Sequence, residues 1–383
     1  MSEELTHLSL TDVAEAIRTK QVSAVEVTAA CLRRIERLQP KLNCFISIEA
    51  EAALKAAAVA DADLARGVLR GSLHGVPLAH KDMFYRAGQV STCGSKINRD
   101  FVPDHTATVL SRLEAAGAIY LGGLNMAEFA LGPTGHNEHW GHCRNPWNPD
   151  YITGGSSSGS GSAVAARLTY GALGSDTGGS VRMPAGVCGV VGLKPTWGRV
   201  SRYGVMPLSF SLDTVGPLAR TVQDCACLTR IIAGSDPMDS TSSTALVPDY
   251  EATLSEGMKG IKIGVPTNYY YDELMRVPTI GMSGLCHGSI FFSSLIVSIG
   301  VPLAILFTTK EPIVKENAKE SLNFHINLYI YALIFVVLTL VLIGIPLLVL
   351  LGIISFSMPI IALLKVLNDP SQPYRYPFIF RLI

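Results

Sequence analysis

The sequence predicts an α/β sandwich with a central sheet, followed by an all-α membrane segment. Over roughly the first 270 residues, short apolar runs that suit strands alternate with amphipathic and alanine-rich stretches that suit helices. Strands and helices in this mixed order are typical of an α/β fold. After about residue 275 the chain changes character, because two long apolar runs there carry no charge. We therefore expect two domains, at residues 1–275 and 276–383.

The charge balance and the cysteine pattern restrict the classes of function. Basic and acidic side chains number 31 each, so the chain gives no reason to expect direct binding of nucleic acid. The eight cysteines are scattered without paired CxxC spacing, which indicates reduced thiols of a cytoplasmic protein. The N-terminal residues MSEELTHLSLTDVAEAIR lack the charged-then-apolar pattern of a signal peptide.

The helices of the first domain are predicted from periodicity and capping residues. Residues 8–38 predict two amphipathic helices, with Ser9 or Thr11 as the cap of the first and Ser23 as the cap of the second. Further helices are predicted at residues 49–66, 106–117 and 221–233.

The strands are predicted from short apolar runs. The run GVPLAHKDMF predicts a strand that leads into a functional segment, and AIYLGGLNM predicts a strand and turn. Two more strands are predicted at VCGVVGL (residues 187–193) and IKIGVP (residues 261–266).

Residues 154–182 carry the densest functional signal. They read GGSSSGSGSAVAARLTYGALGSDTGGSVR, in which two glycine- and serine-rich turns flank an apolar helix and strand. Such composition is often that of a flexible linker, but a linker would not enclose a buried helix and strand. A phosphate-binding loop would need a Gly-Lys-Ser or Gly-Lys-Thr sequence before a helix, and the chain contains neither.

Serine and lysine in this setting point to nucleophilic catalysis. A serine hydroxyl needs a base to remove its proton, and lysine fills that role in known serine–lysine variants. The lysine must be neutral, which burial favours by lowering its pKa. Lys81 follows the apolar run GVPLAH, which favours burial. Gly178 and Gly179 permit a tight turn whose N–H groups could bind a developing oxyanion.

These motifs closely resemble the amidase signature family, from about residue 5 to about residue 270. The resemblance includes GVPLAHKDMF, GPTGHNEHWGHCRNPWNP, the serine/glycine stretch, CGVVGLKPTWGRVSRYG and DTVGPLARTVQD. It implies a mixed central sheet covered by helices. It also implies that Lys81 is the base, that Ser156 relays the proton at a cis peptide bond, and that Ser180 is the nucleophile. The backbone of Thr177, Gly178 and Gly179 would form the oxyanion hole, and the supporting positions are Ser157, Ser175 and Asp176.

The resemblance implies hydrolysis of a small-molecule carboxylic amide to an acid and ammonia or an amine, through a seryl intermediate and without a cofactor. One alternative is a protein like the glutamyl-tRNA amidotransferase subunit that belongs to the same family. The segment GHNEHWGHC looks more like free-standing amidases. A second alternative is an inactive, truncated amidase fused to a membrane anchor, because amidase signature enzymes continue well beyond the point where the family pattern stops here.

A histidine-rich loop presents the one candidate for a metal site. His136, His139, His142 and Cys143 have spacing compatible with zinc ligation. The loop also contains RNPWNP, which suits the family without a metal, so we expect no metal here.

The second domain predicts transmembrane helices, because about 20 apolar residues cross a bilayer. Spans are expected at about residues 289–308, 326–345 and 346–366. The segments KENAKESLNFHINLYIYALI and YRYPFIFRLI resemble a family of small bacterial membrane proteins of unknown function, similar to a component of the chloroplast protein-import machinery. The lipid bilayer is therefore an expected partner of a multi-pass C-terminal part.

The two domains give conflicting predictions of the membrane topology. Three spans would put the second domain's basic residues on one side, which the positive-inside rule assigns to the cytoplasm; they are Lys310, Lys315, Lys319, Lys365, Arg375 and Arg381. The amidase part would then lie outside, although its features suit the cytoplasm. We interpret this conflict as a sign that two unrelated genes are joined in one reading frame.

Overall fold

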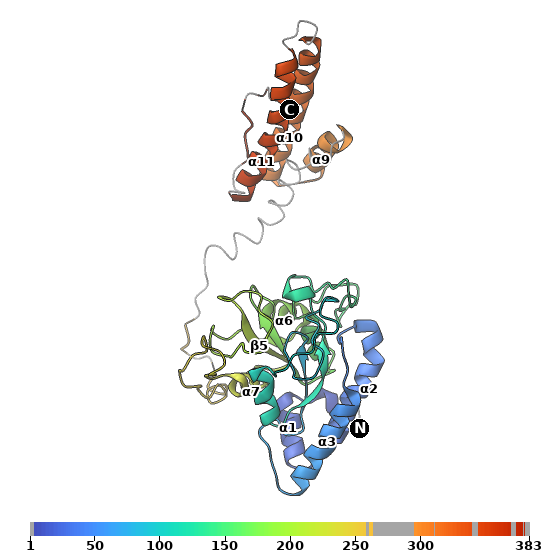
Figure 1. Ribbon diagram of the computed structural model, residues 1–383, viewed down its shortest axis with the longest axis vertical. Coiled ribbons are helices and arrows are strands. Elements are labelled where there is room, and N and C mark those ends of the chain that lie inside the picture. Colours follow the sequence, from blue (N-terminus) through green and yellow to red (C-terminus); the bar gives the residue numbers. More distant parts are fainter. Residues whose placement is uncertain are drawn as a thin grey trace. The chain divides into compact units, whose positions relative to one another are not determined.

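The chain forms two compact units, Met1–Met258 and Lys259–Ile383 (Figure 1). The computed structural model describes residues 4–257, 260–262, 295–309, 311–338, 344–368, 373–377 and 379. The domain boundary predicted at residue 275 lies outside these ranges.

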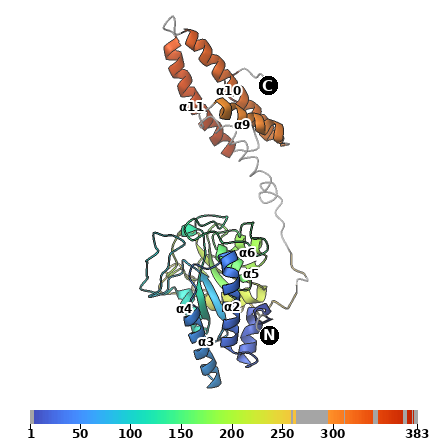
Figure 2. The same ribbon diagram turned by 90° about the vertical axis from the view of Figure 1, so that its right-hand side faces the viewer.

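The first unit begins with three helices after a short 3-10 turn, η1 (Glu4–His7). They are α1 (Leu10–Arg18), α2 (Ala24–Leu42) and α3 (Ala50–Ala65). Ser9 caps α1 by accepting a hydrogen bond from the Asp12 N–H, and Ser23 forms a capping box with Glu26 at the start of α2. The two amphipathic helices predicted at residues 8–38 are confirmed, and α2 continues to Leu42. Figure 2 shows α2 and α3 side by side in this unit.

The sheet has five strands in the order β2-β1-β3-β5-β4. β1 (Pro77–Lys81) pairs in parallel with β2 (Ile119–Leu124) and with β3 (Gly171–Asp176). β5 (Thr214–Ala219) runs antiparallel to both β3 and β4 (Val191–Gly192). The predicted mixed central sheet is thus confirmed.

Helices from the rest of the first unit pack on this sheet. α5 (Ser158–Ala165) contacts β1 and β3, and α7 (Val222–Ile232) contacts β5. The remaining elements are α4 (Thr108–Ala115), η2 (Glu128–Ala130) and α6 (Arg182–Cys188). Helices and strands together bury one continuous apolar core, to which α1 contributes Leu10, Val13 and Ile17 and β1 contributes Leu78.

One strand prediction needs correction, and another is untested. At residues 187–193 the chain first completes α6, which ends at Cys188 because Gly189 adopts a left-handed conformation (φ 69°) suited to a helix C-cap. Only Val191–Gly192 is a strand. Short apolar runs do not distinguish a helix end from a strand. The strand predicted at residues 261–266 stays a prediction, because residues 263–266 lie outside the described ranges; residues 261–262 are not part of a strand.

The second unit contains α9 (Leu295–Thr308), α10 (Pro312–Leu338) and α11 (Gly344–Asn368). α10 packs against both of the other helices. It begins at Pro312, well before the span predicted from residue 326, while residues 289–294 and 339–343 lie outside the described ranges. In the described part of the chain, one helix is long and apolar enough to cross a membrane, at Ile345–Asn368.

Two helical glycines provide a test of the packing of the first unit. A Cβ on Gly159 of α5 would lie 2.4 Å from the Cys44 carbonyl oxygen and 2.5 Å from the Asn125 backbone nitrogen. A Cβ on Gly186 of α6 would meet no atom within 4 Å. Gly159→Ala should therefore destabilise the fold by about 1–3 kcal/mol through overpacking. Gly186→Ala should stabilise it by up to about 1 kcal/mol, because alanine favours a helix.

Thermal unfolding of the full chain, followed by near-ultraviolet circular dichroism, measures both changes. Opposite shifts in Tm are expected. Equal shifts in the two variants would contradict the close backbone approach at Gly159.

Candidate active site

The sheet brings Lys81 next to the serine/glycine stretch. Lys81 is the last residue of β1, and Ser175 and Asp176 end the neighbouring parallel strand β3. The carboxyl ends of parallel strands share one edge of a sheet, where open α/β sheets commonly place their sites. Lys81 and the turn that follows Asp176 therefore meet at this edge.

Lys81 lies fully buried between two serine hydroxyls. Its Nζ donates to Ser156 Oγ at 2.7 Å and to Ser175 Oγ at 2.9 Å. Burial lowers the pKa of Lys81 from 10.5 to about 7, against the opposing influence of Asp176, Asp213 and Cys93. Burial thus favours the neutral amine.

Ser156 is positioned by a sharply folded glycine segment. The Gly155–Ser156 peptide bond is cis, at the position where the family resemblance implies one. A Cβ on Gly155 would lie 2.5 Å from the Gly132 carbonyl oxygen, so no larger residue fits without a shift. The Ser156 carbonyl accepts a hydrogen bond from the Ala127 N–H at 3.1 Å, which anchors the segment to the chain after β2.

The turn at residues 177–180 is fixed from one end by Asp176. This buried carboxylate accepts from the N–H groups of Gly179 (2.8 Å) and Val181 (3.1 Å) and pairs with the Arg182 guanidinium at 2.9 Å. Burial on its own would raise the pKa of Asp176, but the hydrogen bonds from Arg182 and Val181 outweigh it and lower the pKa. The carboxylate therefore stays ionised.

Ser180 ends this turn and is half-buried. Its carbonyl oxygen accepts from the Ser157 N–H at 3.2 Å, so the turn is tied directly to the segment that carries Ser156. Ser157 Oγ also donates to the Ser175 carbonyl at 3.4 Å. The predicted catalytic and supporting residues thus gather around one edge of the sheet.

The neighbours of Lys81 on the chain face other partners. Asp82 accepts from the Thr92 N–H at 2.9 Å, and burial raises the pKa of Asp82 to about 6 against the hydrogen bonds from Thr92. Burial and the positive charge of Arg86 lower the pKa of His80 to about 4. His80 is therefore neutral at physiological pH.

The histidine-rich loop forms local pairs. His139 Nε2 lies 2.8 Å from Glu128 Oε1, and the rings of His136 and His142 lie 4.5 Å apart. Among the described residues, no group of three or more histidines, cysteines or carboxylates could hold a metal ion.

Two features of the site were not predicted. Thr177 Oγ1 donates to Asp213 Oδ1 at 2.5 Å, and a cavity of about 190 Å³ lies beside this contact. Its lining includes Met83, Ser175 and Asp213. Asp213 stands in the motif DTVGPLARTVQD, which carried the family resemblance without indicating a role for the carboxylate.

The fold and site define an amidase-type protein, and comparison with known families agrees. The chain belongs to the amidase family, whose profile matches residues 26–277. Residues 279–383 match a second profile, that of the magnetosome magnetite crystal formation protein family. The junction of two families predicted from the sequence is thus confirmed.

Individual relatives support the same assignment. The chain is 51% identical over 268 residues to the amidase-family subunit of glutamyl-tRNA(Gln) amidotransferase from Nitrosococcus oceani. The match covers 70% of this chain and 55% of the relative. The chain therefore spans about half the length of the curated relatives it matches.

Solved structures are similar as well. One, described as a vestigial protein complex that reveals the evolutionary origins of an s-triazine catabolic enzyme, has a TM-score of 0.68 at 34% identity, covering 82% of this chain and 73% of that one. The peptide amidase from Stenotrophomonas maltophilia has a TM-score of 0.59 at 37% identity, covering 72% and 53%.

The buried lysine should impose a pH dependence on stability. In the unfolded chain a lysine keeps its proton up to its ordinary pKa of 10.5, whereas folded Lys81 loses it above about 7. The unfolded state binds more protons between these values, so stability rises with pH in that window. Lys81→Met should remove this rise.

The urea midpoint, measured at pH values from about 7 up to the ordinary thiol pKa of 9.0, checks the prediction. Lys55→Met changes an exposed lysine on α3 and should retain the wild-type slope. A Lys81→Met slope equal to that of the wild type would contradict the lowered lysine pKa.

Proposed function

We propose that the first unit hydrolyses a carboxylic amide through a seryl intermediate. Ser180 is the nucleophile, Ser156 relays its proton, and Lys81 is the base. The observation that carries the proposal is the buried 2.7 Å contact between Lys81 Nζ and Ser156 Oγ, formed by a lysine whose pKa is about 7. A base with a pKa near the working pH is the most effective.

Ser180 Oγ bonds to the amide carbon while its proton passes to Ser156, whose own proton passes to Lys81. The N–H groups of Thr177 and Gly178 stabilise the oxyanion. The Gly179 N–H donates to Asp176 Oδ1 at 2.8 Å, so the proposal does not include the predicted role of Gly179 as a third oxyanion donor.

Collapse of the intermediate breaks the C–N bond, and the relay returns the proton to the leaving nitrogen. Water then attacks the acyl-enzyme, with Lys81 again as base, and releases the acid and free Ser180. The supporting residues act on the geometry: Ser175 orients the lysine, Ser157 ties the relay segment to the turn, and Asp176 fixes the turn.

A fluorophosphonate probe tests the nucleophile. The wild-type chain should be labelled and Ser180→Ala should not, because the probe reacts with an activated serine. The labelling rate of the wild type should rise with pH as Lys81 loses its proton, around its pKa of about 7. Lys81→Ala should slow labelling by roughly 10²–10⁴-fold, the usual contribution of a positioned base, and should abolish this rise. Undiminished labelling of Ser180→Ala would overturn the assignment.

A second candidate within the family is the role of the amidase-family component in a glutamyl-tRNA amidotransferase. The 51% identity to such a component favours it. On this reading glutamine is the amide substrate and partner subunits, not this chain, contact the tRNA. Glutamine-dependent amidation of glutamyl-tRNA upon addition of partner subunits would support it. Turnover of other amides by the chain alone would favour the free-standing amidase.

For the second unit we propose insertion in a lipid bilayer. α11 contains the candidate span, and large apolar side chains on it are exposed, among them Ile353 (60%) and Phe356 (64%). Exposed apolar surface of this kind suits contact with lipid.

Extraction of membranes with alkaline carbonate tests the insertion. The wild-type chain should stay in the membrane pellet. Changing Ile353 and Phe356 together to lysine should raise the extracted fraction, since each central charge costs about 2.5–3.5 kcal/mol on insertion. Leu246→Lys, at an exposed position of the first unit, is the control and should stay in the pellet. Extraction of the wild-type chain would contradict the proposal.

A further inference from the structure

The turn that carries Ser180 is fixed at both ends by carboxylates. At the end that carries Ser180, the N–H groups of Gly179 and Val181 donate hydrogen bonds to the Asp176 carboxylate. At the start of the turn, Thr177 Oγ1 donates a hydrogen bond to Asp213 Oδ1 at 2.5 Å. The antiparallel register of β3 and β5 pairs Asp176 with Thr214, which brings Asp213 alongside Thr177 although the two are far apart in the sequence.

Asp213 is itself fixed by the loop that precedes it. Its Oδ2 accepts from the Leu208 N–H at 2.7 Å and the Ser209 N–H at 2.8 Å. Its own N–H donates to the Ser209 carbonyl at 3.0 Å. The carboxylate therefore closes the loop and cannot swing away from Thr177 without breaking these bonds.

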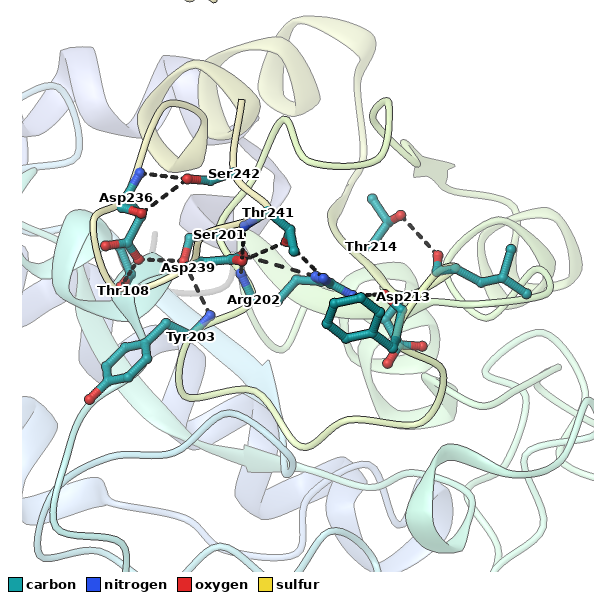
Figure 3. Close-up of polar contacts among 12 residues, drawn as sticks. Thr108, Ser201, Arg202, Tyr203, Asp213, Thr214, Asp236, Asp239, Thr241 and Ser242 are labelled. Atoms are coloured by element: carbon teal, nitrogen blue, oxygen red, sulfur yellow. Dashed lines mark hydrogen bonds and ion pairs between the residues drawn. The ribbon is translucent and has the colours of Figure 1, made fainter. Parts of the chain in front are cut away.

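Arg202 secures this loop to the rest of the unit. Its guanidinium donates to the Phe210 carbonyl and, at 2.7 Å, to Thr241 Oγ1. It also lies 5.2 Å from the centre of the Phe210 ring. Its backbone N–H donates to Asp239 Oδ2 at 2.8 Å. Figure 3 shows this network running from Asp239 and Thr241 through Arg202 toward Asp213.

We propose that Asp213 is a positioning residue of the amidase reaction: through the Thr177 hydroxyl it fixes the end of the turn that presents the oxyanion donors and Ser180. The inference rests on the function proposed above. Asp213 makes no covalent contribution. It acts by keeping Thr177 in place, with the Arg202 network as its support.

Asp213 also acts on the charge of the base. Three groups raise the pKa of Lys81 through their charge, against the effect of burial: Asp176 at the end of β3, Asp213 before β5 and Cys93 in the loop after β1. The hydroxyls of Ser156 and Ser175, which contact Nζ directly, are neutral. Removing the Asp213 charge therefore favours the neutral amine and moves the rise of activity to lower pH.

Variants of the full chain separate the two effects, with the rate of fluorophosphonate labelling of Ser180 measured against pH. Asp213→Asn removes the charge and leaves one acceptor oxygen for three donors. We expect labelling at high pH to slow by roughly 10²-fold, the usual cost of a small misplacement of reacting groups. The midpoint of the pH profile should move to lower pH.

Thr177→Val keeps the charge of Asp213 but removes the hydrogen bond. It should slow labelling about as much as Asp213→Asn does, but the midpoint of the pH profile should be that of the wild type. Thr177→Ser, which restores the hydroxyl, should restore the rate. Asp239→Asn is the matched control, because Asp239 belongs to the same network without contacting Thr177. The pH profile of labelling of this variant should have the wild-type midpoint.

Labelling of Asp213→Asn at the wild-type rate with an unmoved midpoint would overturn the inference while leaving the proposed function intact. Equal slowing by Thr177→Ser and Thr177→Val would overturn it too, since the hydroxyl would then be irrelevant. If a thermal melt shows that Asp213→Asn is unfolded, the comparison of Thr177→Val with Thr177→Ser tests the inference by itself. Loss of the proposed function itself has a different signature, namely labelling that persists in Ser180→Ala.

Discussion

The site depends on one constraint, the burial of an amino group among neutral hydroxyls. Lys81 is fully buried, and Ser156 and Ser175 are its hydrogen-bond partners. An ammonium taken out of water without a directly paired carboxylate is costly, so the neutral amine becomes accessible near neutral pH. A carboxylate in contact with Nζ would stabilise the charged form. Asp82 instead accepts a hydrogen bond from the Thr92 N–H.

Close backbone approach around the lysine follows from this constraint. Ser156 must reach Nζ from a segment that is packed on the end of the sheet. The positions of the glycines there have no room for a side chain. A Cβ on Gly174 would lie 2.7 Å from Ser157 Oγ, and one on Gly155 would strike the Gly132 carbonyl. The glycines thus serve the geometry of a buried polar site as much as the turns themselves.

The sequence was most informative where a role depends on local residues. The glycine-rich turns and the apolar run before Lys81 are local signals, and they located the groups that the sheet brings together. The Asp213–Thr177 contact could not be predicted in this way, because it depends on the antiparallel register of β3 and β5. The strand predicted at residues 187–193 was wrong over its first part for a related reason. An apolar run alone did not reveal that Gly189 ends a helix there.

Polar side chains bind backbone N–H groups in both units. In the first, charges at the sheet edge act on one another through the interior, so that Asp176 and Asp213 alter the protonation of Lys81. In the second, polar groups of α10 bind backbone: Glu320 accepts from the Tyr376 N–H at 2.8 Å and Asn317 from the Tyr374 N–H at 3.1 Å. These bonds give the backbone N–H groups of Tyr374 and Tyr376 acceptors on α10. In the first unit Asp213 likewise accepts from the backbone N–H groups of Leu208 and Ser209, while its charge also raises the pKa of Lys81.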